Sequence, residues 1–170
     1  MKTFTFRTYN EETDFETVYN YHCDYAIKTA GYQLSGASPC ATEEMFRESM
    51  ARIEHRAIKF HIIADENDKP IGIMNLGQYW RIARHRSLNV ILWENAELKE
   101  EVVRRALDMA FSFTLLRMFV CTVNGNDVRL LDACRNVGMQ EVGCIPDYFC
   151  YEGEVYPEYK FIIKREDWIK

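Results

Sequence analysis

Cysteine is the most chemically versatile residue type in this chain, but its spacing defines no site. The 6 cysteines are Cys23, Cys40, Cys121, Cys134, Cys144 and Cys150. No two of them form a CxxC pair, and no histidine accompanies them at the spacing of a zinc site. Residues 1–10 read as a polar, alternating strand rather than as a secretion signal. We therefore expect reduced, buried thiols in a cytoplasmic protein, and no metal site.

Histidine could supply acid–base chemistry near neutral pH, and the chain has 4 histidines. His85 stands in the basic stretch 81–86, which is typical of a solvated loop. The other three, His22, His55 and His61, lie within or at the end of helix and strand patterns. Structural roles are therefore the simpler interpretation for all of them.

Length and charge limit the kind of protein that these residues can serve. The chain has 170 residues, 48% of them hydrophobic, with a net charge of -5. This length predicts one globular domain, residues 1–170. An acidic chain is poorly suited to neutralise many phosphates, so we expect no nucleic-acid partner. No apolar run approaches the ~20 residues of a membrane span, so we expect no membrane partner either.

The first half of the chain predicts a strand, two helices and a hairpin. Residues 3–8 alternate as a strand, and Asn10 then caps a helix over 13–30. A loop over 31–39 leads to a second helix that begins at Thr42. The segments 57–64 and 71–79 are strand-like and flank the polar turn 65–70, so they predict a hairpin.

The second half alternates strands and helices. The run 87–94 predicts a strand buried on both faces, and Asn95 can cap the clearest helix. That helix spans 96–113, with a buried stripe of Leu98, Val102, Ala106, Met109, Ala110 and Phe113. A strand over 115–123 and a helix over 127–137 follow, and Gly138 stops the helix. Strands at 139–150 and 155–163 close the chain. The order predicts an α/β domain with a mixed, partly parallel sheet.

Several segments, in the right order, resemble the GNAT superfamily of acyl-CoA-dependent N-acetyltransferases. The segment 64–72 (ADENDKPIG) resembles the central hairpin of that superfamily, and 106–111 resembles the middle of its main helix. The segment 126–139 resembles its N-x-R to K-x-G-F region. Gly143, residues 151–153 and the tail 165–168 resemble the branch that acetylates ribosomal-protein N-termini. The resemblance implies a central twisted sheet of about six to seven strands, flanked by about four helices.

The resemblance also implies how acetyl-CoA binds as a co-substrate. Its pantetheine lies between splayed central strands, against backbone of the fourth strand, and its pyrophosphate sits at the N-terminus of the next helix. The cofactor-binding residues carried over are Ile91, Leu92, Trp93, Asn95, Ala96, Glu97, Leu98, Lys99, Asn126, Asp127 and Arg129. The loop at 94–100 departs from the family pattern, because it lacks glycine and is rich in acids. The pyrophosphate loop is therefore degenerate.

Three residues are candidates for catalysis on the same grounds. Glu94 ends the presumed fourth strand and could act as the base for an amine, or simply complement the helix dipole. Cys134 stands where many members have a tyrosine acid, although a cysteine there could also be core. Tyr148 or Tyr159 could act as an acid or orient an amine, or could pack at the edge of the core.

Aromatic residues could line a pocket for the amine. They are Tyr19, Tyr21, Tyr25, Tyr32, Tyr79 and Trp80. Ordinary packing of a mixed sheet is the alternative for each of them.

The resemblance therefore implies an N-acetyltransferase that moves an acetyl group to a primary amine by direct attack on the thioester. The acceptor would be a small-molecule or peptide amine. Two alternatives remain: a non-catalytic GNAT-like domain that binds another ligand or a protein, and an interaction subunit that could form a homodimer.

Overall fold

The computed structural model describes residues 3–30, 42–55, 59–80 and 84–168. The loop expected at 31–39, which includes Tyr32, lies outside the described residues, as does Cys40. The side chains of Tyr79 and Trp80 are not described either.

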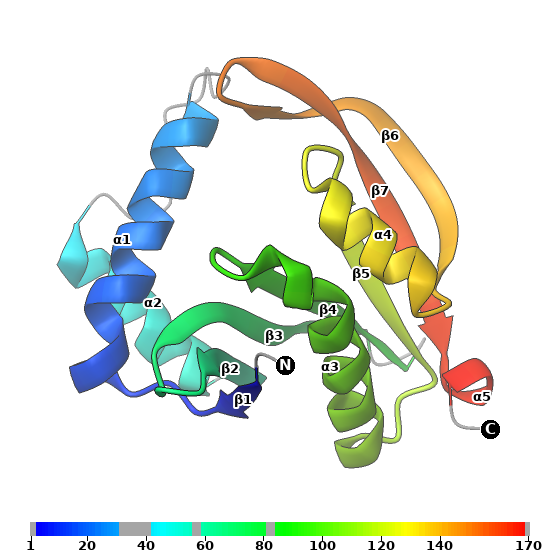
Figure 1. Ribbon diagram of the computed structural model, residues 1–170, viewed down its shortest axis with the longest axis horizontal. Helices are drawn as coiled ribbons and strands as arrows, with labels where there is room; N and C mark the ends of the chain where they lie inside the picture. Colours follow the sequence, from blue (N-terminus) through cyan, green and yellow to red (C-terminus); the bar gives the residue numbers. More distant parts are fainter. Residues whose placement is uncertain (1–2, 31–41, 56–58, 81–83, 169–170) are drawn as a thin grey trace.

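A single mixed sheet runs through the molecule (Figure 1), with the strand order β1-β2-β3-β4-β5-β7-β6. The strands are β1 (Phe4–Arg7), β2 (Lys59–Asp65), β3 (Pro70–Trp80), β4 (His85–Leu92), β5 (Met118–Asn124), β6 (Gln140–Tyr151) and β7 (Glu154–Lys164). The helices are α1 (Glu11–Ala30), α2 (Glu43–His55), α3 (Lys99–Phe113), α4 (Val128–Asn136) and α5 (Arg165–Trp168). The predicted order of elements and the mixed sheet are confirmed. The described residues form seven strands, where six to seven were expected, and five α-helices, where about four were expected.

The β2–β3 turn forms because one carboxylate satisfies two backbone donors. Asp65 Oδ1 accepts hydrogen bonds from the N–H groups of Asn67 and Lys69, each at 2.9 Å. Asp68 adopts a left-handed conformation with φ 63°, which aspartate tolerates better than most residues. The polar segment 65–70 therefore closes the hairpin as predicted.

An ion-pair network fixes the start of α1. The side-chain oxygen of Asn10 accepts a hydrogen bond from the N–H of Glu12 at 3.0 Å, so the predicted cap is confirmed. Asp14 is 0% exposed and receives the two terminal nitrogens of Arg7 at 2.7 and 2.8 Å. Arg7 Nε also donates to Asp68 at 2.7 Å. The network thus joins β1, α1 and the β2–β3 turn.

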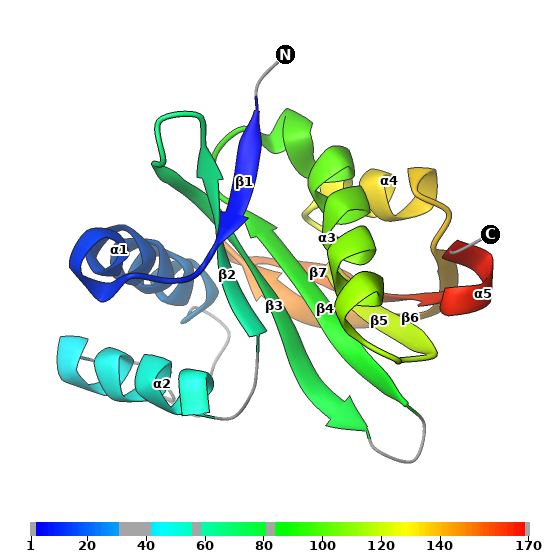
Figure 2. The ribbon, with the colours of Figure 1, turned by 90° about the horizontal axis from the view of Figure 1, so that it is seen from below.

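The helices divide between the two faces of the sheet (Figure 2). Helices α1 and α2 pack over Ile62 and Ala64 of β2 on one face. Helices α3 and α4 cover the other face, above the larger core that contains Phe111, Phe119 and Phe161. Two hydrophobic clusters therefore lie on opposite sides of one sheet.

The prediction that β4 is buried on both faces is wrong. Leu88, Val90 and Leu92 are buried, whereas the residues between them are only half-buried. Helix α3 covers the face that those three residues share. Among the described residues, no helix combines the length and the apolar character needed to cross a membrane.

Helix α3 begins later than predicted. Residues Ala96–Leu98 form a 3-10 turn that precedes it. Asn95 is left-handed, with φ 55°, and its side chain makes no capping hydrogen bond, so the expectation that it caps the helix is wrong. Its carbonyl accepts from the N–H of Leu98 at 2.8 Å instead. Phe113 is 70% exposed, contrary to the predicted stripe, because the buried face turns through Val103 and Leu107.

The C-terminal elements follow the sequence closely, with two differences. Gly138 has φ 88° and ends α4 as predicted, and Gly153 has φ 85° in the β6–β7 turn. The strand expected from Leu115 begins only at Met118, and Leu115 is 92% exposed. The tail forms the short helix α5, where the indole N–H of Trp168 donates to Asp108 Oδ1 at 2.9 Å.

Candidate functional site

Strands β4 and β5 diverge, as the resemblance implies. They pair only between His85–Ser87 and Met118–Val120, although β4 continues to Leu92 and β5 to Asn124. Beyond that point, within the described part of the chain, β4 pairs only with β3 and β5 only with β7. Two backbone edges therefore face one another without pairing, and each carries donors and acceptors that a ligand could use. We call this region the splay.

Helices α3 and α4 both begin at the open end of the splay, and an ion pair joins them there. Lys99 Nζ lies 2.6 Å from each carboxylate oxygen of Asp127. The Lys99 side chain is 10% exposed and that of Asp127 is 31% exposed. Asp127 also caps α4, since its Oδ1 accepts from the N–H of Leu130 at 3.0 Å. Two of the residues predicted to bind acetyl-CoA thus contact each other.

The loop between β4 and α3 contains no glycine, and Asn95 adopts the left-handed conformation that a glycine often provides. Trp93 is half-buried: its indole N–H donates to the carbonyl of Pro70 at 3.3 Å, and its backbone N–H donates to that of Ile71 at 3.1 Å. Ala96 and Glu97 are exposed, and Leu98 packs partly against the large core.

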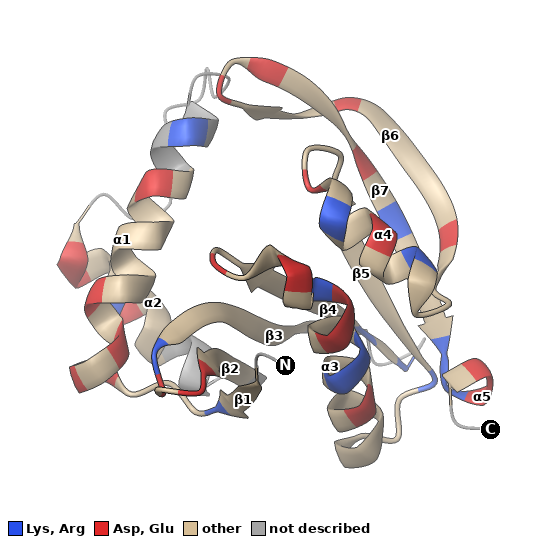
Figure 3. Cartoon of the chain, in the orientation of Figure 1, with Lys and Arg blue, Asp and Glu red and all other residues tan. Residues whose placement is uncertain are grey.

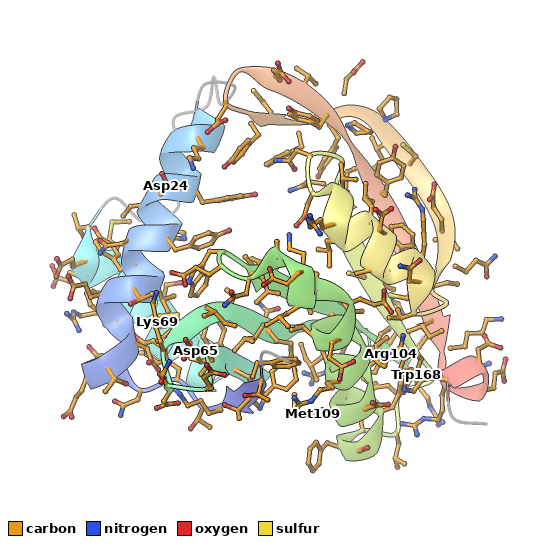
Figure 4. All side chains as sticks on the ribbon, viewed as in Figure 1. Asp24, Asp65, Lys69, Arg104, Met109 and Trp168 are labelled. Carbon is orange, nitrogen blue, oxygen red and sulfur yellow. The ribbon has the colours of Figure 1, made fainter. Side chains whose placement is uncertain are left out.

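Glu94 is held at the β2–β3 turn. Lys69 Nζ lies 2.7 and 3.0 Å from its two carboxylate oxygens, and both side chains are about half exposed. Lys69 stands beside Asp65 in that turn (Figure 4). The hydrogen bond to Glu94 raises the pKa of Lys69, so its positive charge persists well above neutral pH.

Acidic residues gather at the start of α3, as Figure 3 shows. One of them, Glu100, is turned toward α4. Its carboxylate accepts from the side-chain amide of Asn136 at 3.0 Å and from Arg104 at 3.1 Å. These bonds lower the pKa of Glu100. The charge of Glu100 is therefore partly compensated by groups away from the loop.

The turn before α4 is fixed by close contact with β7. The Gly125 N–H donates to the carbonyl of Pro157 at 2.7 Å. A Cβ atom at Gly125 would lie 2.8 Å from Pro157 Cδ, so the approach requires glycine. Asn126 is half-buried in this turn, and Arg129 is exposed on the first turn of α4.

Cys134 lies in the core. It is 0% exposed on α4, and its thiol is hydrogen-bonded to that of Cys121 on β5, which is 1% exposed. The hydrogen bond to Cys134, together with burial, raises the pKa of Cys121 well above that of an ordinary thiol. Both are free cysteines, outside any disulfide.

Aromatic side chains form a series that crosses from β4 through α1 to β6. The ring centroids of Trp93 and Tyr21 are 4.7 Å apart, those of Tyr21 and Tyr25 6.3 Å, and those of Tyr25 and Phe149 6.3 Å. Phe149 stacks in turn on Tyr151 at 6.3 Å. We call these five residues the aromatic row. It includes two residues of the predicted acceptor pocket, Tyr21 and Tyr25.

Helix α1 is also bonded to the half of the sheet on the β5 side of the splay, which consists of β5, β7 and β6. The Tyr25 hydroxyl is hydrogen-bonded to the side chain of Asn124, at the end of β5. The Lys28 ammonium is hydrogen-bonded to Tyr151 and lies 5.8 Å from the centroid of its ring. The carbonyl of Lys28 accepts from the N–H of Glu152 at 2.9 Å. Sequence reasoning missed Asn124, Lys28 and Phe149, because their significance depends on α1 lying against strands far away in the chain.

Other predicted residues lie elsewhere. Tyr19 points to the opposite side of α1, where it packs 5.4 Å from the ring of Phe46 on α2. Tyr148 is 55% exposed on the outermost strand, β6. Tyr159 packs against the large core, 5.9 Å from the Arg135 guanidinium.

Comparison with solved structures identifies the fold. A spermidine N-acetyltransferase from Vibrio cholerae, in complex with CoA and spermine, is similar with a TM-score of 0.81 over 98% of each chain, at 16% sequence identity. Mutant forms of the spermidine/spermine N-acetyltransferase from the same organism have a TM-score of 0.79, covering 98% of this chain and 96% of theirs, at 17% identity. A dodecameric structure of that enzyme has a TM-score of 0.74, covering 98% and 96%, at 16% identity.

These likenesses show that the chain has the fold of the GNAT N-acetyltransferases. The similarity to the branch that acetylates ribosomal-protein N-termini is not supported, because these solved structures are spermidine N-acetyltransferases. No protein-family model and no curated protein sequence matches the chain.

Proposed function

We propose that the chain is an acyl-CoA-dependent N-acetyltransferase that moves an acetyl group to a primary amine by direct attack on the thioester. The observation that carries this proposal is the splay: β4 and β5 stop pairing at Ser87 and Val120, and α3 begins at its open end. An extended donor can pair with the free backbone edges, and an anionic group can meet the N-terminus of α3.

The residues at the splay fit acetyl-CoA in part. Backbone groups of Ile91 and Leu92 would hold the pantetheine, and Trp93 would lie beside it. The nearly buried Lys99 would supply the positive charge, which a glycine-free loop needs more than a glycine-rich one. Asn95, Ala96, Glu97 and Leu98 would contribute backbone contacts. From α4, Asn126, Asp127 and Arg129 would border the donor.

We propose that the acceptor is a small amine that carries more than one positive charge. The aromatic row offers ring faces to cations, and Lys28 already places an ammonium over Tyr151. Asp24 and Glu152 are exposed carboxylates close to Lys28. A similar solved structure is a spermidine N-acetyltransferase in complex with CoA and spermine, which favours a polyamine over a peptide N-terminus as the first acceptor to test.

Glu94 remains the proposed base, and Tyr148 and Cys134 remain proposed acids. Of these three, Glu94 has an exposed carboxylate next to the cofactor loop, so it can reach solvent and an incoming amine. Tyr148 is exposed on β6, whereas the thiol of Cys134 is buried in the core, so Cys134 is the less accessible of the two.

A non-catalytic GNAT-like domain is the second candidate function. It is favoured by the Lys99–Asp127 ion pair, because the Asp127 carboxylate already neutralises the ammonium group that a phosphate would contact. Such a domain would bind another ligand, or a protein such as a second copy of itself. A dodecamer of a similar enzyme makes association between copies a reasonable expectation to test by sedimentation.

Isothermal titration with acetyl-CoA and desulfo-CoA, followed by acetyl transfer to spermine, separates the two candidates. We expect micromolar binding of both ligands and release of CoA only when amine is present. Binding without transfer to any of a panel of primary amines would favour the non-catalytic domain. Absence of binding at millimolar ligand, in a sample shown to be folded by circular dichroism, would overturn the acetyltransferase.

A further inference from the structure

Helix α1 supplies hydroxyl groups at the splay, whereas α4 supplies a buried thiol. Cys134 is 0% exposed, and its hydrogen bond to Cys121 turns it toward the core. Tyr21 and Tyr25 are one helical turn apart on α1 and only half-buried. Helix α1 can therefore supply a hydrogen-bond donor to the reaction proposed above, a role that the family resemblance did not assign to it.

Tyr21 lies close to residues that follow the two strands of the splay, β4 and β5. Its ring packs against Trp93, directly after β4. Asp127, which caps α4 and holds Lys99, is one of the charged groups that act on its hydroxyl. Tyr25 beside it is bound to Asn124 at the end of β5. A donor that lies between β4 and β5 therefore passes next to the Tyr21 phenol.

We propose that the Tyr21 hydroxyl donates a hydrogen bond to the departing sulfur of the acyl donor. This inference rests on the proposed acetyltransferase function. In the reaction the amine nitrogen bonds to the carbonyl carbon, the carbon–sulfur bond breaks, and its electron pair leaves on sulfur. The proton lost by the nitrogen passes to the base or to solvent, and the thiolate takes up a proton from a proposed acid or from solvent. Tyr21 stabilises the developing negative charge and remains a phenol throughout.

The surroundings of Tyr21 keep it in the protonated form. Burial raises its pKa to about 12, and the nearby Tyr25, Tyr151 and Asp127 add to that effect. It is therefore a hydrogen-bond donor throughout the neutral range. Tyr25 is a poorer candidate, because its hydroxyl is held by the side chain of Asn124 at the end of β5, whereas the ring of Tyr21 packs on Trp93.

The test compares Tyr21→Phe with Tyr19→Phe, which makes the same change on the same helix but on its opposite side. We expect Tyr21→Phe to lower kcat about 100-fold, with the Kd for acetyl-CoA changed less than twofold. Tyr19→Phe should leave kcat unchanged. Equal losses in both variants, or an unchanged kcat in Tyr21→Phe, would overturn the assignment.

A binding measurement distinguishes a donor to sulfur from a merely structural role. A free thiol ionises near pH ~8.5, so at pH 9 much of the CoA is thiolate. Wild-type protein should then bind CoA about tenfold more tightly than desulfo-CoA, and Tyr21→Phe should bind the two equally. If wild-type protein binds neither ligand, the acetyltransferase itself fails. If it binds and transfers acetyl but shows no such difference between CoA and desulfo-CoA, only the role of Tyr21 fails.

Discussion

Lys99 and Asp127 form an ion pair between the first residue of one helix and the cap of another, with the ammonium 2.6 Å from both carboxylate oxygens. A cation at the N-terminus of α3 is unfavourable for the helix dipole. Asp127 compensates for that cost, because it brings a carboxylate to a side chain that is only 10% exposed. The pair therefore holds the two helix starts together at the open end of the splay.

Replacing Asp127 by Asn tests how much this ion pair stabilises the fold. The amide can still cap α4, but Lys99 loses its counter-charge, so we expect the free energy of unfolding to fall by about 2–4 kcal/mol. Urea denaturation measures the change. The double variant Lys99→Met with Asp127→Asn should recover part of the loss. A cost below about 0.5 kcal/mol for the single variant would mean that the pair is no stronger than an exposed one.

Glu94 can be tested as a base against its own ion-pair partner. Glu94→Gln should lower kcat/KM for acetyl transfer at least about 100-fold, the usual contribution of a general base. Lys69→Met removes the partner but leaves the carboxylate, so activity should be kept or slightly raised. Steady-state kinetics with acetyl-CoA and spermine gives both values. Equal losses in the two variants would assign the carboxylate a structural role.

Gly125 should tolerate no side chain. In Gly125→Ala the new Cβ lies 2.8–2.9 Å from atoms of Pro157, and the turn that presents Asp127 must shift. We expect a loss of about 1–3 kcal/mol, typical of forced overpacking. Gly143→Ala is the matched control, because a Cβ there has no neighbour within 4 Å. Thermal unfolding of the two variants should therefore differ, and similar midpoints would contradict the close approach.

Asp14 should make the fold sensitive to acid. Burial alone would raise its pKa, but hydrogen bonds from Arg7 and the Asn10 backbone outweigh burial and lower it. A carboxyl whose pKa is lower in the folded state than in the unfolded chain stabilises the fold. That stabilisation is complete above the pKa in the unfolded chain, about 4, and is lost as the pH falls through the pKa in the folded state. Wild-type stability should therefore fall more steeply below pH ~4 than that of Asp14→Asn. Urea midpoints at several pH values would show parallel curves if Asp14 were unimportant.

Thiol reactivity should follow burial. Cys144 on the outer strand is exposed, so a maleimide should label it rapidly in native protein. Cys121 and Cys134 should react only after denaturation, because both are buried. In addition, the hydrogen bond between them and burial raise the pKa of Cys121. Peptide mass spectrometry after timed labelling identifies the sites. Fast native labelling of Cys134 would show that its thiol opens to solvent, and would strengthen it as a candidate acid.

Most of the fold could be predicted because its signals are local. Turn residues such as Asp65 and Gly138 act within a few positions, and Asn10 caps the helix that follows it directly. The errors concern burial, one helix cap and the bounds of elements, rather than element type. Phe113 and Leu115 are apolar, but they are exposed at the last residue of α3 and in the segment that follows it.

The candidate site was harder to predict, because its contacts cross long stretches of sequence. Lys99 and Asp127 both belonged to the predicted site, yet nothing in their spacing indicates that they bind each other. The spacing of Tyr21 and Tyr25 signals a shared helix face, but not that the face meets Trp93 and Asn124. Such pairs depend on how the splay and α1 are arranged in space.

The two outer strands of the sheet have a consequence for self-association. Strand β1 has only four residues, and the carbonyl of Phe4 is already bound by Arg105 at 2.9 Å. Strand β6 is interrupted between Ile145 and Phe149, where Pro146 lacks an N–H and Asp147 is left-handed, with φ 50°. Neither edge strand therefore offers a long, regular row of unpaired backbone groups with which another strand could pair. Copies of this protein that associate will do so through side chains, and the sheet itself resists growth into fibrous aggregates.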